Sequence, residues 1–310
     1  MSLVVLEPGI ESRIVDLGRP RTRSLGVPVG GAADRRALIL GNSLIGNPPD
    51  AAALEIALKG PVLRTETAVA GVIFGAPFEA WMNGWPWEVH GFAFTLGAGA
   101  GIEIGGTSRG TRTYLCVRGG FQTPLILGSR SGLEPVRRGE ILPCASSVIR
   151  GRFCPELQST YPDIWTIAVL PGLQASWFDE AEFFAQSFTV TPASNRMGLR
   201  LKGTPLTMPD RELVSEAVGP GAIQVTRDGQ CIVLGVDGQT IGGYPKIAQV
   251  IQADLDALGQ MRPGQRVRFV KITLDEAIRR DRESQAELRA WSMRLRLSLD
   301  AFAAERRFLS

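Results

Sequence analysis

The sequence predicts a mainly β protein built from two domains. Three observations lead to this prediction: the length of 310 residues, the many turn-forming residues (36 Gly and 20 Pro), and a series of short apolar runs between Gly, Pro or charged residues. A chain of this length is longer than one small core needs and suits two domains. Gly and Pro at this frequency are typical of short strands joined by tight turns.

In the first half of the chain, the apolar runs at residues 3–6, 67–75 and 113–117 are predicted strands. One helix is expected to begin after Asp34, a residue type that caps helix N-termini, and to continue to Asn42. Pro, Ser and Tyr interrupt the pattern at residues 155–162, so we place a domain boundary there.

The second half has its own predicted strands, at residues 164–170, 223–226, 230–234 and 267–270, and the Arg227-Asp228-Gly229 turn indicates a hairpin. From Leu274 to about Phe302 the chain is charged, lacks Gly and is predicted to be helical. Leu288, Trp291, Leu295 and Phe302 would share one face of this helix, which we interpret as a packing brace. We therefore expect domains at 1–158 and 159–273 and a helical extension at 274–310.

A weak internal repeat relates the two halves. Asp34 and Glu55 are separated by 21 positions, as are Asn195 and Glu216, and a Gly-Pro pair follows in both halves. The repeat predicts two related domains with pseudo-symmetry.

Composition argues against several classes of function. The net charge is +3 and no long Lys/Arg run is present, so nucleic acid is not the expected partner. The four Cys form no Cys-x-x-Cys pair and have no His cluster beside them, which disfavours zinc and a disulfide framework. His90 is the only histidine; it lies in a strand-like run, so His-based catalysis is not expected. The N-terminus lacks signal-peptide features and no apolar run reaches membrane-spanning length, so we expect a cytoplasmic protein.

The segment from Gly238 to Lys246 is the strongest candidate for a ligand-facing element. It follows an apolar strand that ends at Asp237, and its double Gly would let the backbone approach a ligand closely. Asp237 is a candidate general base or metal ligand, and Lys246 is a candidate for neutralising a developing anion. An ordinary β-turn with solvated polar residues is the alternative interpretation of the same residues, and both stay open.

A second candidate is the Gly128-Ser129-Arg130-Ser131-Gly132 turn, where small residues around an Arg suit an anion. An exposed turn is the alternative here too. No P-loop motif is present, and residues 97–102 lack the last Gly and the helix of a dinucleotide-binding loop.

Taken together, these segments resemble the family that includes the C-type component of bacterial 5-oxoprolinase, the KipA-type proteins, allophanate hydrolase subunit 2 and the carboxyltransferase-like half of urea carboxylase. The matching stretches run from about residue 10 to residue 270: 16–19, 25–28, Asp34, Asn42, 46–47, 54–56, 119–120, 127–131, 195–201, 220–225, 239–240, 242–246 and 263–264.

The resemblance implies a pair of cyclophilin-like β-barrel domains, and partners resembling the B-type and A-type components of 5-oxoprolinase. It implies that the complex opens 5-oxoproline, or a related cyclic amide, to glutamate with ATP and Mg. A lactam is a poor electrophile, and phosphorylation of its oxygen creates a leaving group, so cations and an oriented water are needed. The implied catalytic residues are Asp237, Lys246 and Arg196. The implied ligand-binding residues are Ser129, Arg130, Ser131, Gln224, Gln239, Thr240, Gly242, Gly243 and Tyr244. No metal-ligand set is predicted.

Two other functions stay open within the same resemblance. One is the carboxyltransferase component of a biotin-dependent urea or amide carboxylase, although this chain has no biotin attachment motif. The other is a non-catalytic regulatory protein of the KipA type. The family pattern is also altered after Ser131, where the loop to Glu140 is shorter than usual.

Overall fold

The computed structural model describes residues 2–87, 90–154, 157 and 160–307, and the side chains of the last helix up to residue 297. The chain divides into two compact units. The first contains residues 1–18, 35–160 and 286–310, and the second contains residues 19–34 and 161–285. The predicted boundary at residues 158 and 159 lies outside the described residues. No sequence pattern indicated that residues 19–34 belong to the second unit, or that the last helix is shared between the two.

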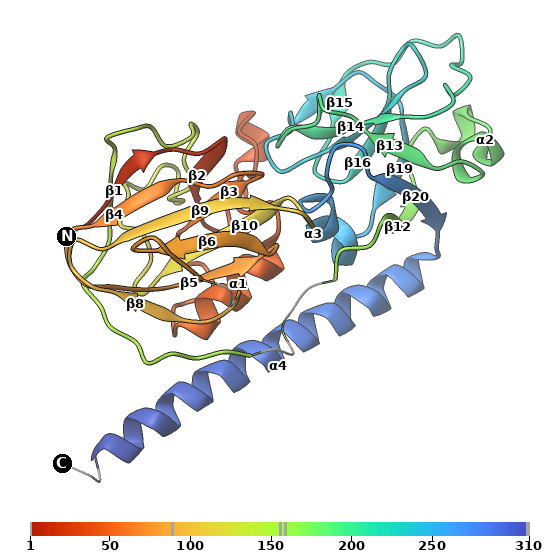
Figure 1. The fold of residues 1–310 in the computed structure, drawn as a ribbon. Helices are drawn as coiled ribbons and strands as arrows, with labels where there is room; N and C mark the ends of the chain where they lie inside the picture. The colour runs from red at the N-terminus through yellow and green to blue at the C-terminus, as the bar shows by residue number, and fades with distance from the viewer. Residues whose placement is uncertain (1, 88–89, 155–156, 158–159, 308–310) are drawn as a thin grey trace. The chain divides into compact units, whose positions relative to one another are not determined.

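The first unit contains two antiparallel sheets (Figure 1). One has the strand order β11-β1-β4-β9-β6-β7, and the other has the order β2-β3-β10-β5-β8. The bounds are β1 Ser2–Glu7, β2 Glu11–Val15, β3 Ala53–Ala57, β4 Val62–Thr65, β5 Val69–Gly75, β6 Phe78–Met82, β7 Trp85–Pro86, β8 Phe94–Leu96, β9 Gly101–Thr107, β10 Arg112–Val117 and β11 Ile141–Pro143.

Gly9 lets the chain pass from the first sheet to the second. It has a φ of +73°, and a Cβ atom there would lie 2.5 Å from the carbonyl oxygen of Lys59. Consecutive strands β1 and β2 enter different sheets, and the described strands of this unit form two sheets. The mainly β class itself is confirmed.

Helix α1 (Arg35–Leu44) packs on β5 and β10 of the five-stranded sheet. At the contact, a Cβ atom on Gly41 would lie 2.9 Å from the Cys116 Sγ atom and 3.0 Å from Phe74. All residues of β3 and β10 are buried. Burial on both faces of β10 explains why residues 113–117 appear in the sequence as an apolar run without alternation.

The second unit is a closed barrel with the strand order β12-β19-β16-β17-β14-β13-β20, as the predicted barrel fold requires. β12 and β20 pair in parallel, and the other neighbours are antiparallel. A separate two-stranded ribbon is formed by β15 and β18. The bounds are β12 Ile164–Pro171, β13 Phe188–Val190, β14 Gly198–Lys202, β15 Glu216–Ala217, β16 Ala222–Val225, β17 Cys231–Leu234, β18 Ile241–Gly242, β19 Lys246–Val250 and β20 Arg266–Lys271.

Aromatic and aliphatic side chains fill this barrel. Phe183 and Phe269 stack with ring centroids 5.1 Å apart, and Phe188 packs beside both. In β20, Val267 and Phe269 are buried while Arg266 and Arg268 are exposed, which is the period-two pattern of a strand with one face in a core. Each buried Phe contributes roughly 1.5–3 kcal/mol to folding.

The other elements with described bounds are the helices α2 (Glu180–Phe184), α3 (Leu255–Leu258) and α4 (Leu274–Arg307), and short 3-10 turns at Arg23–Leu25, Ala175–Trp177 and Gln252–Asp254. Along α4, Leu288 and Trp291 are half-buried and Leu295 is buried, as expected for one packing face. Phe302, the fourth residue predicted for that face, lies outside the described side chains. Within the first unit, Ser43 donates to Ser292, and Arg152 donates to the carbonyl oxygen of Leu295.

Candidate functional site

Lys246 is a buried ammonium group at the start of β19, and only 5% of the residue is exposed. It forms an ion pair with Glu216 of the β15–β18 ribbon. A buried ammonium group is costly without such a counter-ion. The hydrogen bond from Lys246, followed by one from Gln174, lowers the pKa of the Glu216 carboxyl below its ordinary value. The Glu216 carboxyl is therefore ionised at neutral pH, and Lys246 Nζ has further donor capacity for an incoming acceptor.

Gln174, in the loop after β12, connects the two charged residues. Its side-chain oxygen accepts a bond from the Lys246 N–H (3.0 Å), and its amide nitrogen donates to Glu216 Oε1 (2.8 Å). The loop lies tightly against β19, because a Cβ atom on Gly172 would lie 2.2 Å from the Lys246 carbonyl oxygen. Gln174 is 7% exposed, so these bonds form away from bulk water.

Gln224 of β16 is fully buried close to the ribbon. Its Oε1 accepts a bond from the exposed Gln239 (3.3 Å), while its Nε2 has no hydrogen-bond partner among the described residues. A Cβ atom on Gly242 would lie 2.5 Å from that Nε2. Only Gly lets the ribbon backbone approach the amide this closely. A buried donor without a partner is costly, so Gln224 is a donor suited to a bound ligand.

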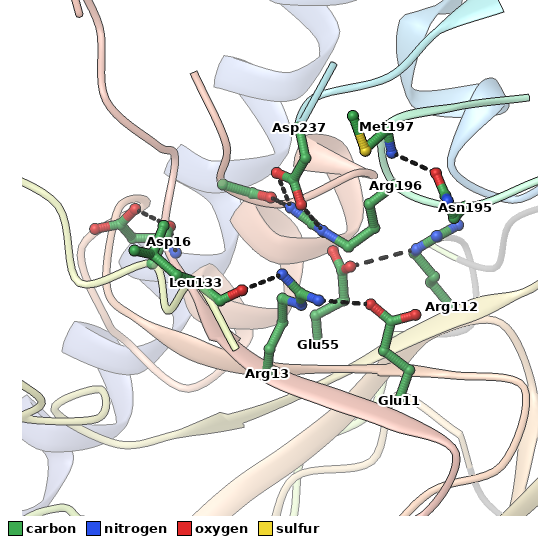
Figure 2. Close-up of polar contacts among 12 residues, drawn as sticks. Glu11, Arg13, Asp16, Glu55, Arg112, Leu133, Asn195, Arg196, Met197 and Asp237 are labelled. Carbon is green, nitrogen blue, oxygen red and sulfur yellow. Dashed lines mark hydrogen bonds and ion pairs between the residues drawn. The ribbon is translucent and has the colours of Figure 1, made fainter. Parts of the chain in front are cut away.

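Arg196 and Asp237 pair with each other in the second unit. Arg196 Nε lies 2.6 Å from Asp237 Oδ2 and its Nη2 lies 2.9 Å from Oδ1, a bidentate geometry (Figure 2). The same Nη2 donates to the carbonyl oxygen of Gly31 at 2.7 Å. The resemblance implies catalytic roles for both residues. In the structure they bond each other, and Arg196 also bonds the chain's own backbone at Gly31.

Thr240, Gly243 and Tyr244 complete the segment predicted to face a ligand. The Thr240 carbonyl accepts a bond from the Val218 N–H (3.0 Å), and Gly243 lies beside Ser215. Tyr244 is 39% exposed. The segment is thus one arm of a β-ribbon with polar residues at its base.

Ser129, Arg130 and Ser131 surround a carboxylate in the first unit. Asp16 accepts from both Ser hydroxyls (2.6 and 2.7 Å) and from the Arg130 N–H (2.6 Å). The Arg130 side chain donates to the carbonyl oxygen of Thr123. These donors were predicted to hold an external anion, but each of them bonds an oxygen of the chain.

The first unit also contains a buried polar row that the sequence analysis did not predict. Glu55 lies opposite Arg13 on β2 and Tyr114 on β10, so the three side chains share one sheet face. Tyr114 donates to Glu55 at 2.8 Å. Arg112 Nε lies 3.3 Å from the same carboxylate (Figure 2). Arg13 bonds Glu11 and the carbonyl oxygen of Leu133.

Three further observations concern the described part of the chain. His90 lies in a turn rather than the predicted strand, and burial lowers its pKa. No three His, Cys, Asp or Glu side chains gather there to hold a metal ion. None of the helices in that part combines the length and apolar character needed to cross a membrane.

Gln224 and Lys246 are cross-strand partners on β16 and β19, and Gln239 bonds Gln224. The structure thus joins these three predicted residues in the second unit, and adds Glu216 and Gln174. The sequence signal for Glu216 was its place in the internal repeat. Gln174 had no signal beyond the Pro171-Gly172 step before it.

The family model for the carboxyltransferase domain, subdomain A and B, matches residues 25–271. The chain belongs to this carboxyltransferase-domain family. Among curated relatives, the C-type component of 5-oxoprolinase from Escherichia coli is 36% identical, and the match covers 94% of this chain and 98% of that protein. The corresponding protein of Haemophilus influenzae is 32% identical, with 92% and 96% covered.

Larger relatives contain the carboxyltransferase domain as one part. Urea amidolyase of Lachancea kluyveri is 31% identical over 91% of this chain, which corresponds to 17% of that protein. The crystal structure of the Kluyveromyces lactis urea carboxylase has a TM-score of 0.85 and 26% identity, covering 94% of this chain and 29% of that one. The predicted fold class and family are therefore confirmed.

Proposed function

We propose that this chain is the C-type component of a 5-oxoprolinase complex, in which ATP hydrolysis drives opening of 5-oxoproline, or a related cyclic amide, to glutamate. The observation that supports it best is the extent of the match to the E. coli relative, which covers nearly all of both chains. The name of that relative implies a complex of several different chains. We propose partners resembling the A-type and B-type components, and a cytoplasmic location.

The Lys246 group is the proposed ligand-binding site. 5-Oxoproline presents a lactam carbonyl and a carboxylate as acceptors, and one N–H as a donor. Lys246 and Gln224 Nε2 are buried donors suited to those oxygens, and Glu216 is an acceptor for the N–H. Donors fixed in a buried site stabilise negative charge that develops on a carbonyl oxygen. Gln239, Thr240, Gly242, Gly243 and Tyr244 would form the ribbon side of this site.

ATP with Mg is assigned to the complex rather than to this chain. Phosphate binding would call for Arg130 and Arg196, but their guanidinium groups bond Thr123 and the Asp237–Gly31 pair. Lys246 alone is a poor match to the charge of a triphosphate. In this proposal, a partner supplies the phosphoryl group to the lactam oxygen, and the present chain holds and polarises the amide.

The test is reconstitution of the chain with A-type and B-type partners, followed by measurement of glutamate formed and ATP hydrolysed. Lys246→Met and Gln224→Leu should each lower glutamate formation by about 100-fold, the effect of removing one fixed donor. Lys202→Met, which removes an exposed cation from β14, is the matched control. Wild-type turnover in both site variants would reject the catalytic site. If both site variants turn over normally but omission of the chain still abolishes turnover, the chain has a binding or regulatory role and not a catalytic one.

Carboxyl transfer is the second candidate, because the matching family model describes a carboxyltransferase domain and a urea carboxylase structure has the same fold. It requires biotin on a separate carrier. Supplying urea and a biotinylated partner in the same assay distinguishes the two. ATP consumption that depends on urea and biotin would favour carboxyl transfer, and consumption that depends on 5-oxoproline would favour lactam opening.

A further inference from the structure

Residues 19–34 form a segment, called the strap below, that belongs to the second unit although it lies between β2 and α1 in the sequence. The strap folds back on itself. The Arg19 N–H donates to the carbonyl oxygen of Val29 (2.7 Å), and the Thr22 hydroxyl donates to the carbonyl oxygen of Arg19 (3.0 Å). It is therefore an ordered loop and not merely a connection.

Arg196 and Asp237 hold one end of the strap. Arg196, whose side chain is 5% exposed, donates to Gly31 and forms the bidentate pair with Asp237. The Gly30 N–H donates to the carbonyl oxygen of Val236 (2.9 Å). Val236 and Asp237 immediately precede the arm that leads to Gln239 and β18. The strap is thus bonded to the residues that lead into the β18 arm of the ribbon.

The same end of the strap is also held at Ala33 and Asp34. Gln260 donates to the Asp34 carboxylate at 2.7 Å, and both residues are buried. A Cβ atom on Gly259 would lie 2.5 Å from the carbonyl oxygen of Ala33.

Arg23 bonds the other arm of the ribbon, just after β15. Its guanidinium donates to the carbonyl oxygen of Val218, which follows β15, and a Cβ atom on Gly219 would lie 2.7 Å from that guanidinium. The Val218 N–H in turn donates to Thr240 across the ribbon. Two residues before Val218 is Glu216, the counter-ion of Lys246. The strap therefore contacts both arms of the ribbon that carries this counter-ion.

We propose that Arg196, Asp237 and Arg23 are positioning residues: they attach the strap to the base of the β15–β18 ribbon, so that the ribbon places Glu216 on Lys246 and Gly242 against Gln224. Arg196 and Asp237 act through the ribbon and do not touch the substrate. The effect on turnover rests on the proposed function, but the effect on the ribbon does not.

Hydrogen exchange of the full chain, without partners or substrate, tests the positioning role directly. Arg196→Lys, which loses the bidentate geometry, and Arg23→Ala should each speed exchange of the Val218 amide at least about 10-fold. Arg227→Ala removes an exposed Arg from the β16–β17 turn and is the matched control. If both strap variants exchange at the rate of the Arg227→Ala control, the proposal is overturned.

Turnover in the reconstituted complex gives the second readout. Because Arg23 acts through Glu216 and Lys246, Arg23→Ala should lower kcat/KM by about 10-fold in the natural chain and cause no further loss in a Lys246→Met background. If Arg23→Ala lowers kcat/KM by the same factor in the Lys246→Met background, the proposal is overturned. A complex inactive on 5-oxoproline would reject the proposed function, while faster Val218 exchange in the strap variants would still support the positioning role.

Discussion

Gln174 forms hydrogen bonds to both backbone polar groups of Lys246, the N–H and the carbonyl oxygen. The Gln174 N–H donates to the Lys246 carbonyl oxygen (3.1 Å), and the Gln174 side-chain oxygen accepts from the Lys246 N–H (3.0 Å). The remaining amide group of Gln174 donates to Glu216. One residue thus fixes the backbone of the buried cation and the carboxylate that neutralises it.

Replacing Gln174 with Ala should destabilise the barrel by roughly 1–3 kcal/mol, because the buried Lys246 N–H loses its acceptor. Glutamate formation should fall further than stability alone explains, because Glu216 also loses a donor. Urea unfolding and turnover of the complex measure the two effects. Gln285→Ala, on the exposed side of α4, is the control. Equal unfolding midpoints for the two variants would contradict the expected role of Gln174.

Gly242→Ala tests the close approach of the ribbon to Gln224. The added methyl group would overlap the Gln224 Nε2 position, so the amide or the ribbon must move. Ligand binding should weaken by about 10-fold or more, measured as an increase in the KM for 5-oxoproline. Gly97→Ala is a matched control, because a Cβ atom there meets nothing within 4 Å. An unchanged KM in Gly242→Ala would remove Gln224 from the proposed site.

Local patterns explain why some of the strands were predictable from the sequence. The apolar runs that became β5, β10 and β12, and the Asp34 start of α1, depend on near neighbours in the chain. Lys246 was named from its Gly-rich segment and again from the family resemblance, and Gln224 was named from the resemblance alone. Their partners depend on contacts distant in sequence: Glu216 is 30 positions from Lys246, and Gln174 is 72 positions away. Periodicity carries no information about such contacts.

The contacts of the strap were even less predictable from the sequence, because they join residues still farther apart in the chain. Arg196 was named for a catalytic role because an Arg in a motif is a candidate anion ligand, and the sequence cannot show that its acceptor is Gly31, 165 positions away. Likewise, Ser129 and Ser131 suit an anion by residue type, and the structure places the Asp16 carboxylate between them. In both cases the residue type was informative, but the identity of the partner required the fold.

Glu216→Gln should reveal the Lys246 ion pair through its pH dependence. Hydrogen bonds from Lys246 and then Gln174 lower the pKa of Glu216 from its ordinary value of 4.5. A lowered folded-state pKa means that the contribution to stability is present above pH 4.5 and is lost as the pH falls through the folded value. The stability difference between the natural chain and the variant should therefore be largest near neutral pH and shrink in acid. Unfolding curves recorded from neutral to acidic pH check this, and a constant difference would contradict it.

Asp16→Asn tests whether the Ser129–Ser131 turn is built around an internal carboxylate. Asp16 is 8% exposed and accepts from two hydroxyls and from the N–H groups of Arg130 and Gly18. The amide has one acceptor oxygen in place of two, and its NH₂ group would face a donor. Because bonds to a charged acceptor contribute about 1.5–3 kcal/mol each, the variant should lose roughly 3 kcal/mol of unfolding free energy.

Urea unfolding measures that loss, with Asp50→Asn, at an exposed loop position, as the control. Added phosphate separates the internal role from an anion-binding role. If the donors serve Asp16, phosphate should leave the stability of the natural chain unchanged. The opposite result has two parts: phosphate stabilises the natural chain, and Asp16→Asn unfolds at the same urea midpoint as Asp50→Asn. That result would support the turn as an anion-binding site.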